Sequence, residues 1–319
     1  MTTAPGPLAE TATRYRAYGI ELACDFELAV EPPAQGSPPP ARSIVTTMRS
    51  RSVVESLRSA GGGPVHRATV AAGTPLLVER GGDGDHLIRY GPHPFHLSAD
   101  LRLLTCAAPN PPELEWEHAL LDWVAYSAAV LAGMQCIHAS AVESSKGVLA
   151  FAAPAGGGKS TLAAELVDRG SAFFCDDVLA LADDGDRVLA YPGPPFALLD
   201  SGARWPVAQL GPKRGTLGSE TWFAAERHAS RPAPVVAITL LDRRAGGPPT
   251  PQIQPGSFLD LRRLAIGIPR PGDREESRFS ILAALADRAP VLRMRSSSSV
   301  SPAVLAHSIE SHLRSEGIL

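Results

Sequence analysis

The stretch FAAPAGGGKSTLAAEL, from Phe151 to Leu166, joins a glycine-rich turn to a helical pattern. It matches the phosphate-binding motif G-x-x-x-x-G-K-[ST] at Gly158, Lys159 and Ser160, but it carries Ala153 where the motif has its first glycine. An apolar strand pattern precedes the turn and an amphipathic helix pattern follows it, which is the context that the motif requires. The stretch therefore predicts a phosphate-binding site. The alternative interpretation is a glycine-rich turn with no ligand, in which Lys159 is solvated.

Consecutive glycines permit the backbone dihedrals that turn several N–H groups inward, and the helix that follows directs its positive end at the same point. In such a site Lys159 would reach the β- and γ-phosphates, and the Ser160 hydroxyl would bind the Mg²⁺ that accompanies ATP. We therefore predict ATP and Mg²⁺ as cofactors. The predicted nucleotide-binding residues are Ala155, Gly156, Gly157, Gly158, Lys159, Ser160 and Thr161.

Two adjacent carboxylates, Asp176 and Asp177, end the strand-like run that follows the predicted helix. In a parallel sheet they would lie beside the phosphate-loop strand at the ligand-binding edge. One carboxylate could help to hold Mg²⁺ while the other accepts a proton from an attacking hydroxyl. These two residues alone leave open a solvated Asp-Asp turn, and His138, on the strand before the loop, is by itself as compatible with a core histidine.

Composition is that of an ordinary soluble protein, with 319 residues, 44% apolar residues and a formal charge of -3. Only three lysines occur and the arginines are scattered, which argues against a nucleic-acid partner. The N-terminus has no pattern of a secretory signal, and the most apolar window, Leu120 to Met134, is too short for a membrane span. We expect a buried helix there, in a cytoplasmic protein with reduced core thiols at Cys24, Cys106, Cys136 and Cys175.

The chain divides by pattern near residue 110. Residues 1–110 carry short strand patterns and a proline-rich linker, Glu31 to Ser43, and predict a small β-rich module. Residues 111–319 begin with a helical pattern and then alternate strands and helices, which predicts an α/β nucleotide-binding domain. The stretch Ala203 to Trp222 is expected to be a mobile loop, whose Arg204 and Arg214 could close over the phosphates or hold a carboxylate.

The run from Ile137 to Leu181 resembles the core of the HPr kinase/phosphorylase family. The shared pattern is a histidine, a hairpin, a phosphate loop, a helix that ends in Arg-Gly, and a strand that ends in Asp-Asp. His138 lies 21 residues before Lys159, and Asp176 lies 17 residues after it, as in that family. The resemblance implies an α/β P-loop kinase core of the HPr kinase type with a small β-rich N-terminal module, and a homo-oligomer.

The resemblance also implies roles for individual residues. Asp176 would be the general base on the substrate serine, and His138 would lie beside it and set its charge and orientation. Together with Lys159 these are the predicted catalytic residues. Ser160 and Asp177 are the predicted metal ligands.

The chain departs from that family after the Asp-Asp strand, where the signature L-E-[IV]-R-G-[LI]-G and its metal-binding glutamate are missing. Asp200 or Glu220 could replace that glutamate, and the loss argues against the HPr protein as acceptor. The segment YGIELACDFEL is similar to divergent members that phosphorylate the C-terminal serine of a lasso-peptide precursor. We therefore predict an ATP-dependent serine kinase with such a peptide acceptor. The alternatives are a small-molecule hydroxyl kinase and a non-catalytic ATP-binding accessory protein.

Overall fold

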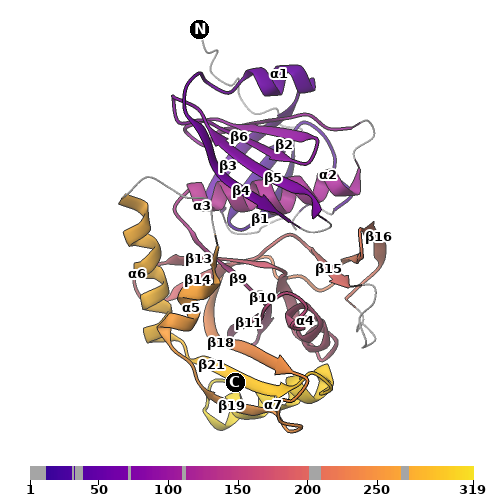
Figure 1. Ribbon diagram of the computed structural model, residues 1–319, viewed down its shortest axis with the longest axis vertical. Coiled ribbons are helices and arrows are strands. Elements are labelled where there is room, and N and C mark those ends of the chain that lie inside the picture. Colours follow the sequence, from indigo (N-terminus) through magenta and orange to yellow (C-terminus); the bar gives the residue numbers. More distant parts are fainter. Residues whose placement is uncertain are drawn as a thin grey trace. The chain divides into compact units, whose positions relative to one another are not determined.

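The structure is a computed structural model that describes residues 12–30, 32, 39–70, 73–109, 113–200, 210–266 and 273–319. The described residues form two compact units, one ending at Ala132 and the other beginning at Gly133 (Figure 1). Each unit combines helices with a sheet of mixed strand directions. The chain is thus a mixed α/β protein.

The first unit is built on an eight-stranded sheet in the order β1-β2-β3-β8-β7-β6-β5-β4. Its first two strands form a hairpin whose turn residues, Tyr18 and Gly19, both have positive φ angles, 55° and 76°. The segment from Thr13 to Cys24 is therefore two short strands joined by a tight turn. The strands and the short helix of this sheet are β1 (Thr13–Ala17), β2 (Ile20–Cys24), β3 (Arg42–Met48), α1 (Arg51–Ser56), β4 (Gly63–Thr69), β5 (Pro75–Arg80), β6 (His86–Tyr90), β7 (His93–Leu97) and β8 (Leu103–Cys106).

A helical segment completes the first unit. It consists of α2 (Leu114–His118), a π-helical stretch (Ala119–Val124) and α3 (Ala125–Leu131), and its apolar side chains are buried, as the sequence predicted. The segment packs on β1, β2 and β6. Since those contacts hold it in the first unit, the boundary between the compact units lies about twenty residues after the boundary at residue 110 that the pattern indicated.

The second unit is built on a ten-stranded sheet, in which β12-β10-β11-β18-β14-β13-β9-β20 are neighbours and β21 pairs with both β18 and β19. The long strand β18 pairs with β14 at its start and with β11 and β21 farther along. The strands are β9 (Gln135–His138), β10 (Ser140–Ser144), β11 (Gly147–Ala152), β12 (Ala172–Cys175), β13 (Val178–Asp183), β14 (Val188–Tyr191), β18 (Ala233–Arg244), β19 (Gln252–Pro255), β20 (Ala265–Ile266) and β21 (Val291–Ser297).

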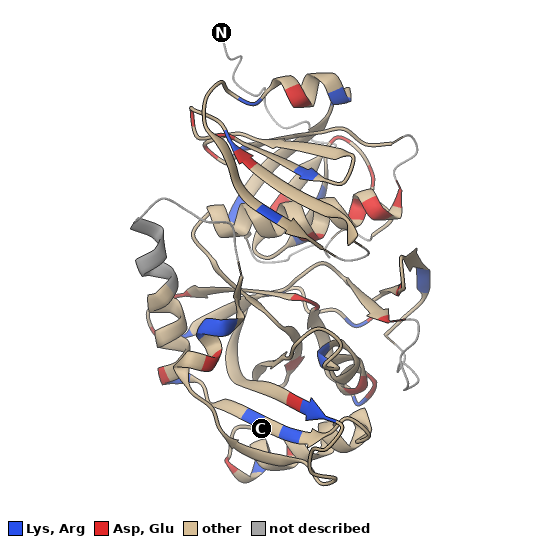
Figure 2. Ribbon diagram, viewed as in Figure 1, with Lys and Arg blue, Asp and Glu red and all other residues tan. Residues whose placement is uncertain are grey.

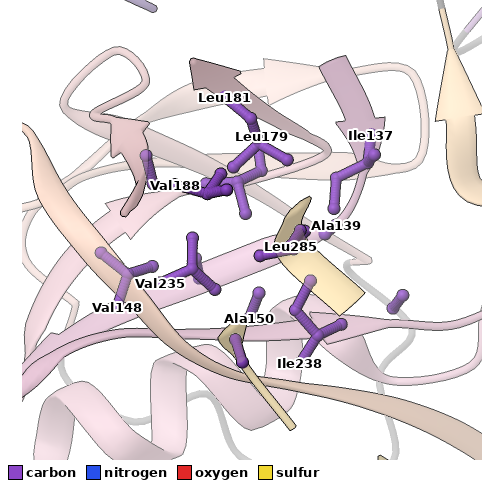
Figure 3. Close-up of a cluster of buried hydrophobic side chains, with 14 of the residues drawn as sticks. Ile137, Ala139, Val148, Ala150, Leu179, Leu181, Val188, Val235, Ile238 and Leu285 are labelled. Atoms are coloured by element: carbon purple, nitrogen blue, oxygen red, sulfur yellow. The ribbon is translucent and has the colours of Figure 1, made fainter. Parts of the chain in front are cut away.

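Helices cover both faces of this sheet around β11. The helices are α4 (Lys159–Asp168), α5 (Phe258–Leu264), α6 (Asp273–Arg288) and α7 (Pro302–Ser315). Val148, Ala150 and Ala152 of β11 belong to a core cluster with apolar residues of α6, and part of this cluster is drawn in Figure 3. The alternate residues Leu149 and Phe151 belong to a second cluster with apolar residues of α4 and α7. Burial on both faces explains why the strand before the phosphate loop is a continuous apolar run.

A separate three-stranded sheet, β15-β17-β16, lies within the second unit. It contains β15 (Phe196–Asp200), β16 (Lys213–Leu217) and β17 (Glu220–Ala224). The expectation of a mobile loop over Ala203 to Trp222 is therefore wrong for its second half, which forms a hairpin with Trp222 fully buried. Arg204 lies outside the described residues, and Arg214 lies on β16.

Basic and acidic residues are scattered over the described elements of both units (Figure 2). All four cysteines are buried and free, which confirms their prediction as core thiols. No helix within the described parts of the chain has the length and apolar character needed to span a membrane.

Candidate active site

The phosphate-loop stretch leaves β11 and enters α4 as predicted. Gly156 and Gly158 have φ angles of 71° and 89°, in the left-handed region that glycine adopts without strain. The N–H of Gly157 donates to the carbonyl oxygen of Pro154 over 2.8 Å, which closes the turn. Gly158 is the N-cap of α4, so the positive end of the helix dipole lies at the loop. This backbone can hold an anion.

Ala153, the residue that departs from the motif, is accommodated without strain. It is buried, its φ angle is not positive, and its side chain packs in the core cluster that covers α4. A Cβ atom added at Gly157 would lie 2.5 Å from the Ala153 Cβ and 2.8 Å from the Pro154 carbonyl oxygen. The space of the loop is thus filled by one methyl group from Ala153, and Gly157 must remain without a side chain.

The strand that precedes the two aspartates has a different neighbour in the sheet from the one predicted. Strand β12 runs in the same direction as β11, but β10 lies between them and is antiparallel to both. The expectation that the Asp-Asp strand lies directly beside the loop strand is therefore wrong. The carboxyl ends of β11 and β12 still point to one edge of the sheet, because both strands are antiparallel to the same neighbour.

Asp176 and Asp177 lie at a break between β12 and β13, opposite a matching break between β9 and β10. The pairing of Ala141 with Cys175 and of Val178 with His138 sets the register on either side. Asp177 has a φ angle of 59°, and the N–H of Val178 donates to the carbonyl oxygen of Asp176 over 2.7 Å. A positive φ angle in a residue other than glycine is strained, and such strain is concentrated at functional sites.

Lys159 connects the loop to these aspartates. Its side chain is only 10% exposed, and its Nζ forms an ion pair with Oδ1 of Asp177, whose side chain is 44% exposed. Burial by itself would lower the pKa of Lys159, but the carboxylates of Asp176 and Asp177 outweigh it and raise the pKa, with a smaller contribution from Glu220. The lysine is therefore fully charged at neutral pH.

Asp176 is the most buried acid of the site, with 9% of its surface exposed. Its Oδ1 accepts a hydrogen bond from the Ser140 hydroxyl, whereas its Oδ2 is buried and has no hydrogen-bond partner among the described residues. Burial, and then the neighbouring charge of Asp177, raises the pKa of Asp176 to about 6, against the opposing effects of Lys159 and the hydroxyls of Ser140 and Ser160. A carboxyl group with this pKa is suited to accept a proton near neutral pH.

His138 lies beside Asp177 rather than in hydrogen-bond contact with the Asp176 carboxylate. Its Nδ1 is 3.0 Å from the carbonyl oxygen of Asp177 and therefore donates to it. Burial, and then the charge of Lys159, lowers the pKa of His138, which keeps the imidazole neutral. The structure thus brings together five of the predicted site residues: His138, Lys159, Ser160, Asp176 and Asp177. Their catalytic and metal-binding roles remain predictions.

The oxygen atoms at the loop have the chemistry that Mg²⁺ prefers. The Ser160 hydroxyl and the carboxylate of Asp177, the predicted metal ligands, are hard oxygen ligands of the kind that this cation binds. No group of three or more His, Cys, Asp or Glu residues is placed to hold a metal within the described ranges. The further acids named from the sequence, Asp200 and Glu220, are directly paired across β15 and β17.

Sequence reasoning missed two residues of the site. Ser140 forms the hydrogen bond to Asp176 and lies 3.4 Å from the Ser160 hydroxyl, oxygen to oxygen. Arg243 donates to the carbonyl oxygens of Ser298 and Val300, and a Cβ atom on Gly158 would lie 2.4 Å from its Nη1. The signal for Ser140 was the cross-strand register, which places it opposite Asp176.

Comparisons with known proteins add little to this geometry. No protein-family model matches the chain, and no curated protein matches it. One solved structure that is similar to part of the chain is the Hpr(Ser) kinase/phosphatase from Coxiella burnetii, at 16% sequence identity and a TM-score of 0.31. The match covers 58% of this chain and 97% of that one. A likeness this weak indicates neither the function nor the roles of the site residues.

Proposed function

We propose that the protein is a cytoplasmic, ATP-dependent kinase that phosphorylates a serine hydroxyl. The observation that carries the proposal is the pair formed by the phosphate loop and Asp176. A buried carboxylate with one unpaired oxygen lies next to a lysine and a helix N-terminus that suit a triphosphate. Proton acceptor and phosphate cradle are the two parts that phosphoryl transfer requires.

In the proposed reaction, Oδ2 of Asp176 accepts the proton of the acceptor hydroxyl. The acceptor oxygen forms a bond to the γ-phosphorus, the bond from that phosphorus to the β–γ bridging oxygen breaks, and ADP leaves. Lys159 and the loop N–H groups hold the phosphates, and Mg²⁺, when bound through Ser160 and Asp177, neutralises phosphate charge. Asp177 supplies the counter-charge of Lys159 in the structure, and bound phosphates would take that place.

The test is transfer of label from γ-labelled ATP to serine-containing acceptors by the purified chain. Asp176→Asn should abolish transfer while ATP binding, measured by calorimetry, stays within about threefold of the wild type. Asp186→Asn removes a charge from an exposed turn of the same unit and serves as the matched control. Wild-type transfer by Asp176→Asn would exclude Asp176 as the base.

The acceptor in this proposal is the C-terminal serine of a ribosomal, lasso-type precursor peptide. It rests on the similarity of YGIELACDFEL to divergent kinases with that acceptor. Gly19 of this segment forms a turn, and its last residue, Leu28, donates its N–H over 2.7 Å to the hydroxyl of Tyr15, which precedes the segment. A panel of a peptide ending in serine, its C-terminal amide and free serine tests the choice. Transfer to free serine alone would favour the small-molecule kinase.

A non-catalytic ATP-binding protein is the second candidate, favoured by the observation that no cluster of three potential metal-binding side chains occurs among the described residues. It predicts ATP binding with no transfer to any acceptor and no hydrolysis. Tight binding of ATP together with a wild-type rate equal to that of Asp176→Asn would establish it.

A further inference from the structure

We infer that Ser140 is a positioning residue of the phosphotransfer site, which holds one oxygen of Asp176 so that the other is left for the acceptor. The inference rests on the proposed function. Its starting point is that a buried hydroxyl on β10, the strand between β11 and β12, lies close to Ser160 at the start of α4 and donates to Asp176 just after β12. Ser140 itself is fully buried.

The cross-strand register explains why Ser140 and Asp176 meet. Ala141 pairs with Cys175 on one side and His138 pairs with Val178 on the other, so the intervening positions place Ser140 opposite Asp176. Side chains that are directly opposite in an antiparallel pair lie on one face of the sheet within contact distance. The contact is therefore a property of the sheet, and a change of register by one residue would remove it.

The hydrogen bond from Ser140 fixes the rotational orientation of the Asp176 carboxylate. The terminal torsion of an aspartate side chain has a broad, roughly two-fold profile, so its two oxygens can exchange places. With the Ser140 hydroxyl donating to Oδ1, the orientation is fixed and Oδ2 remains unpaired. The same hydroxyl oxygen is 3.4 Å from that of Ser160, so Ser140 also links the aspartate to the first turn of α4.

The decisive variants are Ser140→Ala, which deletes the hydroxyl, and Ser140→Thr, which keeps it. Loss of a partner that orients a reacting side chain typically lowers activity about 10- to 100-fold. We expect Ser140→Ala to lower kcat by that factor with KM for ATP changed less than about threefold, and Ser140→Thr to restore most of the rate. Ser144→Ala, at the far end of β10, removes a serine hydroxyl that donates to Gly147 and is the matched control.

A second measurement keeps the inference separate from activity. In a double-mutant cycle of Ser140→Ala and Asp176→Asn, the two effects on the free energy of unfolding should be non-additive if the side chains are coupled. Additive effects together with a wild-type kcat in Ser140→Ala would overturn the inference while leaving the kinase intact. Absence of transfer by the wild type would overturn the proposed function instead, and the cycle would still report whether Ser140 holds Asp176.

Discussion

Two buried aspartates, one in each unit, are hydrogen-bonded to a serine but differ in what their second oxygen contacts. In the first unit, Oδ1 of Asp85 accepts from the Ser59 hydroxyl over 2.5 Å, and Oδ2 accepts from the Ser59 N–H and from His96 over 2.9 and 2.8 Å. In the second unit, Asp176 has a serine on one oxygen and no described partner on the other.

The pKa values follow this difference. Burial by itself would raise the pKa of Asp85, but hydrogen bonds from Ser59 and His96 outweigh it and hold the pKa below its usual range. Burial raises the pKa of Asp176 to about 6 because its hydrogen bonds are too few to compensate. A satisfied buried carboxylate joins two segments of chain, whereas an unsatisfied one has capacity left for chemistry.

The largest expected effect is on phosphoryl transfer. Asp176→Asn should lower kcat by about 10³-fold, within the range that a general base contributes, whereas Asp85→Asn should leave kcat within about twofold. Both variants are compared by initial rates with labelled ATP. A large loss of kcat in Asp85→Asn, with the protein still folded by circular dichroism, would remove the distinction between the two aspartates.

The next largest effect is on the free energy of unfolding, which the two substitutions should change in opposite directions. Asp85→Asn should lower the free energy of unfolding by about 2 kcal/mol, because buried partners lose a charged acceptor. Asp176→Asn should raise it by about 1 kcal/mol at pH 7, since an ionised and poorly paired carboxylate is removed. Urea denaturation measures both, with Asp186→Asn as the unchanged reference. Destabilisation of similar size in both variants would contradict the comparison.

Asp176 and Asp85 should also differ in how their contributions depend on pH. In the proposed mechanism the transfer rate requires ionised Asp176, so the rate should rise about tenfold per pH unit below pH 6 and level off above it. The folded pKa of Asp176 lies above its unfolded value, so its contribution to stability declines as the pH rises from about 4 to 6. Asp85 has a lowered folded pKa, so its contribution is lost as the pH falls through that pKa. Measurements of kcat and of the free energy of unfolding in urea, made over the same pH range, test both predicted directions of change.

The smallest expected effect concerns the partner of Asp85. His96→Gln should lower the free energy of unfolding by about 1 kcal/mol, because one of three hydrogen bonds to the carboxylate is lost or weakened. Phosphoryl transfer should be unchanged. A drop in kcat larger than the loss of folded protein explains would show that the first unit affects the chemistry.

Local patterns were sufficient to predict the elements that carry the site. The apolar run before the glycines is β11, and the helix that begins at Lys159 is α4, because burial on two faces and a glycine N-cap both leave signals in nearby residues. The place of β12 was not predictable in this way. β10 pairs with β11 across a tight turn between Ser144 and Gly147, which is a local feature. The pairing of β12 with β10 joins strands that the phosphate loop and α4 separate in the chain, and Ser140 gained its contact with Asp176 only through that pairing.

The departure at Ala153 is a case where local reasoning was sufficient. Alanine needs only an ordinary φ angle, and the structure gives it one. The positive φ angle of Asp177 was not predictable from its residue type, because it follows from the turn that joins two strands at the site.

Strand β18 has a consequence for how the protein is made. It supplies the parallel neighbour of β11, yet it begins at Ala233, some eighty residues after the strand it supports. A ribosome therefore synthesises the phosphate loop long before the sheet around it can close, and contacts of such sequence separation slow folding. The proposed ATP binding should accordingly arise late in biosynthesis, after β18 has left the exit tunnel and paired with β11.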